Sequence, residues 1–368
     1  THIRPGAMPY NISRRFEAVV QDLLTRAGVT VLKRHYARLP VMEGRRIQAV
    51  IVEDLASFET VRVEVSGCVI EASGDGEIAA RAGADFDYGS ESREEFGERS
   101  APEQRNRLVQ GTSLVAIAQH TGRDVPFVAP DNTPEFRART WHGHLGSYLN
   151  HHASWPLQAG EIMFLYVTEA GGDCDTVRDD GAIYEELLRQ LWAEWDHIKN
   201  GPHREAARCL DLLWVSPKAG KRESRRFLGD HVLTQTDLEA GRCFEDDIAY
   251  GGHDLDEHRV YAGGADILTH SVVPMYGIPF RCCYSRNTDN LLLAGRLVSA
   301  THLAHSSVRV MGTGAAIGQA VGLAAALCVE KDCTPRELRV GSMEELQARL
   351  AATDGTIPGR PMPPGKDL

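Results

Sequence analysis

Two histidines and one arginine lie in a segment, residues 290–329, that could position them for chemistry. His302, His305 and Arg309 follow a short apolar run that predicts a buried strand. They precede small residues that predict a helix beginning near Met311. Free N–H groups at such a helix N-terminus, with a dipole equivalent to about half a positive charge, favour an anionic or electron-accepting cofactor. Arg309 could bind a carboxylate through its planar guanidinium; the alternative is a salt bridge that pins the loop.

Three glycines of this predicted helix, Gly314, Gly318 and Gly322, recur every four residues and therefore share one face. Glycine inside a helix costs up to about 1 kcal/mol relative to alanine, so we infer that another group approaches the backbone closely there. Burial against a sheet is one alternative. A membrane span is another, but the apolar run 315–329 is interrupted by Gln319 and is shorter than the ~20 residues that a span needs. We therefore expect no membrane partner.

A second glycine motif, at 74–79, matches G-x-G-x-x-A, a variant of the dinucleotide-binding fingerprint. It follows a predicted strand and opens a predicted helix, but no second strand with an acidic end follows about 20 residues later. We interpret it as a turn that brings the backbone close to a cofactor. The chain has neither a G-x-S-x-G motif nor a P-loop, which argues against Ser-His-Asp hydrolysis and Walker-type phosphate binding.

Two histidine-rich stretches raise the alternative of a metal-dependent enzyme. The first contains His142, His144, His151 and His152, and the second is 253–258. Histidine and aspartate side chains this close in sequence could bind zinc or iron, yet there is no HExxH motif and no standard helical ligand spacing. The competing interpretation is that these histidines line a polar loop or contact substrate. We expect no metal.

Composition and charge narrow the class of protein. The 368 residues are 42% hydrophobic and 25% charged, which is ordinary for a soluble globular protein with one large or two smaller domains. A net charge of -11 without a basic stripe argues against a nucleic-acid partner. The eight cysteines form no CxxC pair and the first residues lack an apolar signal-peptide region, so we expect a cytoplasmic protein.

Hydrophobic periodicity predicts the remaining elements. Amphipathic helices are expected at 13–27 and 182–199, and capping boxes at Thr334 and Ser342 predict two short helices. Short apolar runs between turns predict strands at 29–32, 47–52, 61–65, 68–71, 210–215, 227–234 and 291–294. The region 96–285 differs from its surroundings because it holds all five tryptophans and several long loops.

Several of these segments match one flavoprotein family together. The runs 278–281, 290–296, 307–311 and 314–325 resemble the C-terminal signature of FAD-dependent oxidoreductases. Within the glutathione-reductase-like class, the chain resembles the group related to fumarate reductase and succinate dehydrogenase flavoproteins. Upstream, 69–76 is similar to the second FAD-contact motif, with Ser73 in place of threonine, and 222–234 followed by 254–258 resembles the cap segment. The resemblance covers about 16–350.

The resemblance implies FAD as cofactor and hydride transfer between a small organic substrate and flavin N5. It implies that Arg309 binds a substrate carboxylate, with His302, His305 and His258 as proton carriers near neutral pH. The cofactor contacts that it implies are Ala72, Ser73, Gly74, Asp75, Gly295, Arg296, Met311, Gly312, Thr313, Gly314, Ala315 and Ala316.

The implied fold class is α/β, with an incomplete FAD-binding Rossmann-like domain built from both chain ends. We expect that domain at 1–95 and 286–350, an inserted α+β substrate or cap domain at 96–285, and a flexible tail at 351–368. It is incomplete because family members begin with a G-x-G-x-x-G unit, which is not found upstream of residue 13. The explanations left open are a truncated product, a second polypeptide that completes the FAD site, or a partner-dependent or non-catalytic subunit. We also expect an oligomer.

Overall fold

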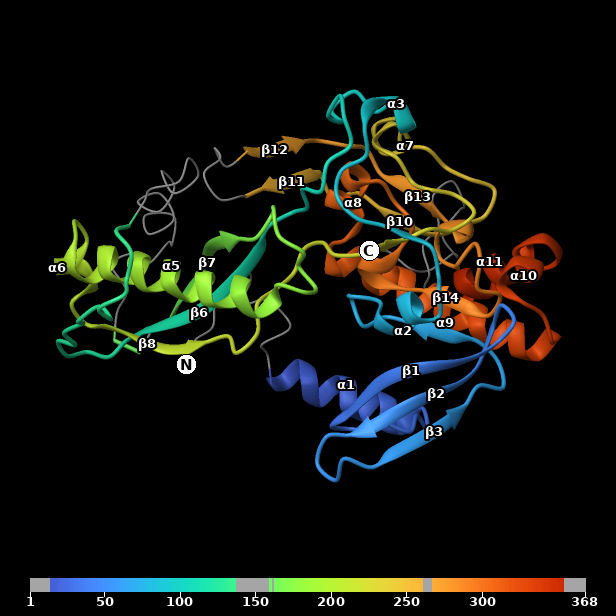
Figure 1. Ribbon diagram of the computed structural model, residues 1–368, viewed down its shortest axis with the longest axis horizontal. Helices are drawn as coiled ribbons and strands as arrows, with labels where there is room; N and C mark the ends of the chain where they lie inside the picture. Colours follow the sequence, from blue (N-terminus) through green and yellow to red (C-terminus); the bar gives the residue numbers. More distant parts are fainter. Residues whose placement is uncertain (1–13, 137–158, 161, 261–266, 354–368) are drawn as a thin grey trace. The chain divides into compact units, whose positions relative to one another are not determined.

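The computed structural model describes residues 14–136, 159–160, 162–260 and 267–353, and Figure 1 shows its elements. The chain divides into two compact units, which are considered separately. The described parts of the first unit are 14–33, 111–136, 159–160, 162–221 and Val260. The described parts of the second unit are 34–110, 222–259 and 267–353.

The first unit contains a three-stranded antiparallel sheet and one long helix. The strands, in their order across the sheet, are β7 (Ile162–Ala170), β6 (Thr112–His120) and β8 (Leu210–Val215). Helix α5 (Asp180–Asn200) packs its apolar face on the sheet through Leu187, Leu191 and Trp195. The helix expected at 182–199 and the strand expected at 210–215 are therefore confirmed.

A buried lysine closes the end of α5. The Lys199 ammonium donates hydrogen bonds to the carbonyl oxygens of Ala207, Arg208 and Leu210 at 2.8, 3.1 and 2.7 Å. These acceptors belong to or follow α6 (Arg204–Ala207). The lysine therefore fixes the chain between the helix and β8.

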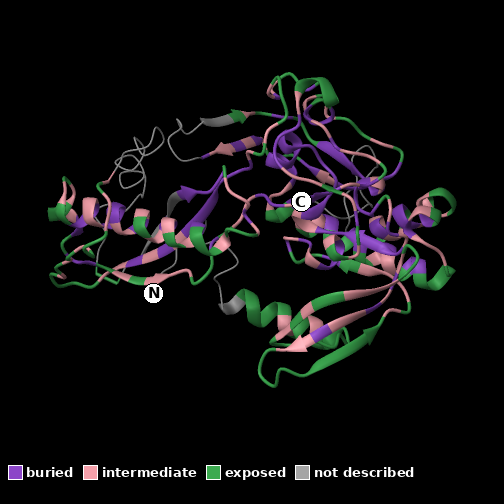
Figure 2. Ribbon diagram, viewed as in Figure 1, coloured by how far each residue is buried: buried purple, intermediate pink, exposed green. Residues whose placement is uncertain are grey.

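Helix α1 (Arg14–Arg26) of the first unit is the amphipathic helix expected at 13–27. Its apolar residues Val19 and Leu23 are 56% and 58% exposed, and Figure 2 draws the helix largely as exposed. Gly28 follows it with a φ of 69°, a conformation that ends helices. The strand expected at 29–32 is wrong, because these residues form no ladder.

The second unit contains the segment 290–329, whose strand β14 (Leu291–Leu293) pairs in parallel with a strand from much earlier in the chain. That strand is β4 (Val69–Glu71), and Val69 is in register with Leu291. All three residues of β14 are buried, as a leucine run in a parallel pair requires. No further strand pairs with the other edge of β4 in the part of the chain that the structure describes.

An antiparallel meander precedes this pair. It consists of β1 (His35–Glu43), β2 (Arg46–Asp54) and β3 (Thr60–Glu64). The remaining elements of the second unit are short and connect the meander, the parallel pair and the C-terminal helices. They are α2 (Glu77–Arg81), β5 (Phe86–Asp87), α3 (Arg93–Phe96), β9 (Arg226–Phe227), α7 (Gln235–Glu239), β10 (Asp247–Gly251), β11 (Leu255–Arg259), β12 (Ile267–Ser271), β13 (Tyr276–Pro279), η2 (Phe280–Cys282), η3 (Gly295–Leu297), α8 (His302–Val308), α10 (Pro335–Gly341) and α11 (Met343–Ala352).

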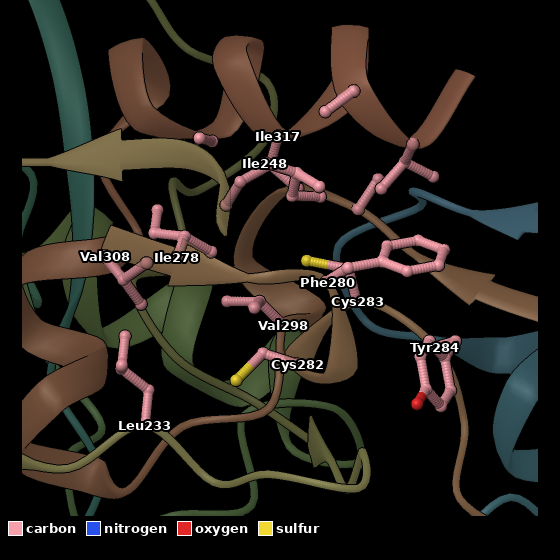
Figure 3. Packing of buried hydrophobic residues seen from close by; sticks show 14 of the residues in the cluster. Leu233, Ile248, Ile278, Phe280, Cys282, Cys283, Tyr284, Val298, Val308 and Ile317 are labelled. Carbon is pink, nitrogen blue, oxygen red and sulfur yellow. The ribbon is translucent and has the colours of Figure 1, made fainter. Parts of the chain in front are cut away.

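Helix α9 (Met311–Lys331) forms one side of the main core of this unit. Figure 3 shows its Ile317 in one cluster with Ile248 of β10 and Ile278 of β13. Within the described chain, α9 is the one helix that is long and apolar enough to cross a membrane. The helix has 21 residues, so the judgement that the apolar run 315–329 is too short to span a membrane was wrong about its length. The buried face of the helix nevertheless packs in the core of this unit. Packing in that core accounts for the buried residues of the helix, such as Ile317 and Leu327, but not for the exposed Met311 and Val329.

Four further sequence-based expectations need correction. The α/β class is confirmed, but the described residues show small separate sheets, with β4 and β14 as the one parallel pair rather than a Rossmann-like sheet. The strand expected at 227–234 is limited to Arg226–Phe227, and Ser342 makes no side-chain cap. The compact units also divide elsewhere than at 96 and 285, since 96–110 and 222–259 belong with the parallel pair. Buried hydrogen bonds such as Gln235 N to Glu98 Oε1, at 2.6 Å, hold those segments there.

Candidate cofactor and substrate site

The turn after β4 has a buried carboxylate at its base. Glu71 Oε1 accepts a hydrogen bond from Ser73 N at 3.1 Å, and Oε2 accepts from Ile78 N and Ala79 N at 3.0 and 3.1 Å. These last two amides are buried donors of the first turn of α2, which have no acceptor within the helix. The G-x-G-x-x-A motif therefore does not offer them to a phosphate, because the chain's own carboxylate occupies them.

Gly74 lets an arginine lie against this turn. Its φ of 90° favours glycine, and a β-carbon there would lie 2.8 Å from the Cζ of Arg296. Arg296 Nη2 also donates to Asp75 Oδ1 at 2.9 Å. Ser224 Oγ donates to the Gly74 carbonyl at 3.1 Å, and Arg225 Nη1 donates to the Asp75 carbonyl at 2.9 Å. The turn at 72–75 and Arg296, both predicted from the sequence, are therefore in contact.

The N-terminus of α9 lies close to Gly295. A β-carbon on Gly314 would be 3.5 Å from the Gly295 Cα, so the helix approaches η3 closely. Val310 gives no side-chain cap, and Met311 and Gly312 are exposed. The first three N–H groups, of Met311, Gly312 and Thr313, have no acceptor within the helix. Gly314 N already donates to Val310 O at 2.9 Å. The N–H groups available to a cofactor are therefore those of residues 311–313, and not those of Gly314, Ala315 and Ala316, which were also expected to contact it.

Two buried nitrogen atoms near this turn have no hydrogen-bond partner among the described residues. They are Arg296 Nε, a donor, and His305 Nδ1. His305 Nε2 lies 2.9 Å from the Arg296 carbonyl oxygen and donates to it, which leaves Nδ1 as an acceptor. Burial, with the nearby charges of Arg226 and Arg309, lowers the pKa of His305 to about 3 although Glu223 opposes this. His305 is therefore neutral at physiological pH.

A fully buried arginine ties the neighbouring segments together. Arg226 donates through Nε to the Ala300 carbonyl at 3.1 Å and through Nη2 to the Gly89 carbonyl at 2.6 Å. It also pairs with Glu223 and, at 2.6 Å, with Glu91. Arg226 belongs to the segment 222–234 that resembles the cap segment, and the carboxylates that it binds are this chain's own Glu91 and Glu223.

His302 extends this cluster. Its Nδ1 lies 2.8 Å from Glu223 Oε2 and its Nε2 lies 2.8 Å from Glu257 Oε1. Burial alone would lower the pKa of His302, but the two carboxylates raise it to about 10. Arg259 pairs with Glu257 on the outer side at 2.5 Å. We call Glu91, Glu223, Glu257, Arg226, His302 and Arg259 the buried ion network.

The network holds as many cations as carboxylates, so its charges balance in the core. His302 stays protonated near neutral pH, and a group with that pKa is poorly suited to exchanging a proton there. Its geometry is that of a fixed cation that joins α8 to β11 and to the segment before β9.

Arg309 follows α8 and lies in a partly exposed polar cluster with β11. Its side chain is 12% exposed; Nε donates to Gln110 Oε1 at 3.0 Å and Nη2 donates to the Asp256 carbonyl at 3.0 Å. His258 Nε2 lies 3.0 Å from Asp256 Oδ2. Burial would raise the pKa of Asp256, but the His258 hydrogen bond and the charges of His258, Arg309 and Arg222 lower it to about 2. Arg309 and His258, separated by 51 positions in the sequence, therefore share one carboxylate.

The structure brings the predicted residues together in two groups. Ala72 to Asp75, Arg296 and the start of α9 form the first, and Arg309 and His258 form the second; His302 and His305 lie in the core between the segments that carry them. Sequence reasoning missed Glu71, Glu223 and Gln110, and a buried glutamate gives no local sequence signal that would have found them. The described residues contain no group of three metal-binding side chains. His142, His144, His151 and His152 lie outside the described residues.

Comparison with known proteins places this arrangement in a family. The sequence model of the family described as FAD dependent oxidoreductase matches residues 9–350. The chain therefore belongs to the FAD-dependent oxidoreductase family, whose cofactor is FAD. No curated protein and no solved structure matches the chain.

The residues of the first group fit such a cofactor. Arg296 Nε is a buried donor that lacks a partner within the described chain, and the uncapped N-terminus of α9 provides further donors to an anionic or electron-rich group. Gly312, at the start of α9, is exposed, and nothing lies within 4 Å of the place where its β-carbon would be. These residues would hold the flavin side of FAD.

Proposed function

We propose that the protein transfers a hydride between a small organic substrate and the flavin N5 of FAD. FAD, when bound, supplies the two-electron chemistry. The observation that carries the proposal is the contact of the Gly74 turn with Arg296, next to the uncapped N-terminus of α9. Positive dipole charge at that helix end favours the electron-rich reduced cofactor over the oxidised one.

Two side chains of the second group are assigned to the substrate. Arg309 binds a substrate carboxylate, and its bonds to Gln110 and Asp256 fix the guanidinium before substrate arrives. His258 takes or gives the proton that accompanies hydride transfer. It is preferred over His302, whose raised pKa keeps it charged, and over His305, whose lowered pKa keeps it neutral. His302 acts by positioning β11, which carries His258.

We further propose that a second polypeptide covers α9 and the outer edge of β4. Seven exposed residues of α9 are small or apolar, namely Met311, Gly312, Ala315, Gly318, Gly322, Ala326 and Val329. The other exposed residues of the helix are Gln319 and, at its C-terminal end, Glu330 and Lys331. Met311 and Val329 are 58% and 60% exposed, and Ile70 on β4 is also exposed. An edge strand beside an apolar helix face is suited to accepting another strand. We place the protein in the cytoplasm, in keeping with eight free thiols.

The test is a visible absorption spectrum of the purified chain before and after addition of FAD. We expect the absorption bands of oxidised flavin, either at once or after loading, and bleaching by dithionite. A chain that neither carries nor binds flavin, alone or with a copurifying partner, contradicts the proposal. A copurifying polypeptide that raises the affinity for FAD supports the proposal that a second polypeptide covers α9 and the outer edge of β4.

A matched pair of glycine variants separates cofactor binding from backbone strain. Gly74→Ala and Gly83→Ala both place alanine at a positive φ, 90° and 78°, where an L-residue is strained by roughly 1–2 kcal/mol. The new β-carbon meets Arg296 only at Gly74, because nothing lies within 4 Å at Gly83. We expect Gly74→Ala to weaken FAD binding at least tenfold more than Gly83→Ala. Equal effects would mean that the turn does not contact the cofactor.

A further inference from the structure

Three cysteine side chains meet at the C-terminal end of α9. Cys328 lies in the last turn of the helix, Cys333 follows two residues after its end, and Cys68 directly precedes β4. The thiols of Cys68 and Cys333 each interact with the thiol of Cys328 by a hydrogen bond. All three cysteines are free.

The backbone holds these thiols in place. The Gly67 carbonyl accepts hydrogen bonds from Arg46 Nη2 at 3.3 Å and from Asn290 Nδ2 at 3.2 Å. A β-carbon on Gly67 would lie 2.5 Å from Val329 Cγ2, so the loop before β4 presses against α9. On the other side, Cys333 N donates to the Cys328 carbonyl at 3.0 Å. Cys68 and Cys333 therefore cannot move away from Cys328 unless these contacts break.

The three thiols differ in reactivity. The hydrogen bond from Cys328 lowers the pKa of Cys68, and the charge of Arg46 contributes in the same direction against the effect of burial. The same hydrogen bond, with burial, raises the pKa of Cys328. Cys68 is half-buried and can be reached by a small oxidant, whereas Cys328 is shielded. Cys68 is thus suited to attack the oxidant. The raised pKa of Cys328 makes it the slower nucleophile, and its role in resolution follows from its contact with Cys68, a partner of lowered pKa that Cys282 and Cys283 lack.

The adjacent pair Cys282 and Cys283 provides an internal comparison. Both are fully buried in the core cluster of Figure 3, and burial raises the pKa of Cys282 well above its ordinary value. They are expected to be inert under conditions that modify Cys68.

We propose that Cys68 and Cys328 form a reversible modification site that converts to a disulfide on reaction with a hydroperoxide, with Cys333 able to receive the disulfide by exchange. The Cys68 thiolate attacks one peroxide oxygen, the O–O bond breaks and the leaving hydroxide is protonated to water. The Cys328 sulfur then attacks the Cys68 sulfenic acid, an S–S bond forms and a second water leaves. Two thiols and one hydrogen peroxide therefore give one disulfide and two waters.

This site differs in place and chemistry from the FAD and substrate groups. Its disulfide would join the loop before β4 to the far end of α9, two elements that carry the predicted FAD contacts at their other ends. In a reducing compartment such a bond would be transient, as cytosolic disulfides usually are.

Peptide mapping tests the proposal on the full chain. Trypsin separates the three thiols because Lys331 lies between Cys328 and Cys333; the fragments are 63–81, 310–331 and 332–336. After brief exposure to equimolar hydrogen peroxide, we expect loss of two hydrogens and a link between 63–81 and 310–331. Longer incubation should add a link between 310–331 and 332–336, and dithiothreitol should reverse both. Oxidation of Cys68 to sulfinic acid without any link would overturn the proposal.

Two variants complete the test. Cys328→Ala should leave a Cys68 sulfenic acid that dimedone traps, with no link to 63–81. A link between Cys68 and Cys333 in that variant would show that Cys328 is not the resolving thiol and would overturn the assignment. Cys243→Ser is the control, because Cys243 is exposed and distant in sequence from the three thiols. Oxidation of the Cys243→Ser variant should give the same disulfide between Cys68 and Cys328 as oxidation of the parent. Loss of that disulfide in the variant would mean that its formation in the parent depends on Cys243.

Discussion

Asp247 on β10 is expected to make the second unit less stable as pH rises. Its Oδ2 accepts a hydrogen bond from Phe244 N at 2.8 Å, and its Oδ1 has no partner within the described residues. Burial, reinforced by the charge of Asp246, raises the pKa of Asp247 from 3.8 to about 7 although Phe244 N–H and Arg281 oppose the shift. The folded state therefore holds this proton more tightly than the unfolded chain does.

The sign and size of the effect follow from that difference. A carboxyl whose folded pKa is raised contributes its stability below the unfolded pKa and loses it as pH rises to the folded pKa. At about 1.36 kcal/mol per pKa unit, the loss between pH 5 and pH 8 is about 2–3 kcal/mol. The side chain in the Asp247→Asn variant cannot ionise. Between pH 5 and pH 8, the free energy of unfolding of the variant should therefore rise relative to that of the parent by about 2–3 kcal/mol, and the difference should stay constant above pH 8.

The measurement must report on the second unit. All five tryptophans fall between residues 111 and 221, within the first unit, so intrinsic tryptophan fluorescence would miss the effect. Hydrogen exchange of peptides that cover β10 and β13, across urea and pH, reads the correct region. Asp332→Asn is the control, because Asp332 is exposed with a φ of 48°, which asparagine tolerates. A parent-minus-variant difference that stays constant from pH 5 to pH 8 refutes the reasoning.

Three further outcomes are expected. His302→Gln should lower the free energy of unfolding by about 3–5 kcal/mol, because it removes the cation that two buried carboxylates share and leaves the network with one excess negative charge; adding Glu257→Gln should restore part of that loss in urea titrations. Gly318→Ala should raise the melting temperature through a gain of up to ~1 kcal/mol, because nothing lies within 4 Å of the added carbon; a fall would mean that this part of α9 is already covered. Glu71→Leu should cost about 1–3 kcal/mol, because two buried amides of α2 lose their acceptor, and should weaken FAD binding. Glu77→Gln, at a partly exposed ion pair with Arg81, should change stability by less than about 1 kcal/mol.

Local patterns predicted the elements that build the cofactor group. The leucine run of β14, the small-residue helix α9 and the glycine turn after β4 all follow from composition over a few neighbouring residues. The parallel pairing of β4 with β14 could not be predicted, because neither short apolar run carries a sequence signal that identifies the strand with which it pairs. The strand predicted at 29–32 failed for a related reason: an apolar run forms a strand only when another strand is available to pair with it.

Polar residues of the site were harder to predict. Arg309 was recognised by its place before a helix, yet its partners Gln110 and Asp256 come from separate segments. Arg226 stands among other arginines, a pattern that usually indicates a surface, and only the tertiary structure shows that Glu91 and Glu223 neutralise it. The roles assigned to His302 and His305 depended on near-neutral pKa values, and burial together with neighbouring charges moves these in opposite directions.

The pairing of β4 with β14 sets an order on how the chain can fold during synthesis. Val69 is in register with Leu291, 222 positions later (291 minus 69), whereas the partners of β6 in the first unit have all emerged by Val215. The sheet of the first unit can therefore form while the ribosome is still translating the second half of the chain. The meander can pair its own three strands early, but β4 has no strand partner until β14 has been made. Apolar residues that pack on the C-terminal leucines, such as Ile47 of β2, stay uncovered in the meantime. Nascent chains stalled before and after β14 should accordingly differ in protease resistance within 34–110.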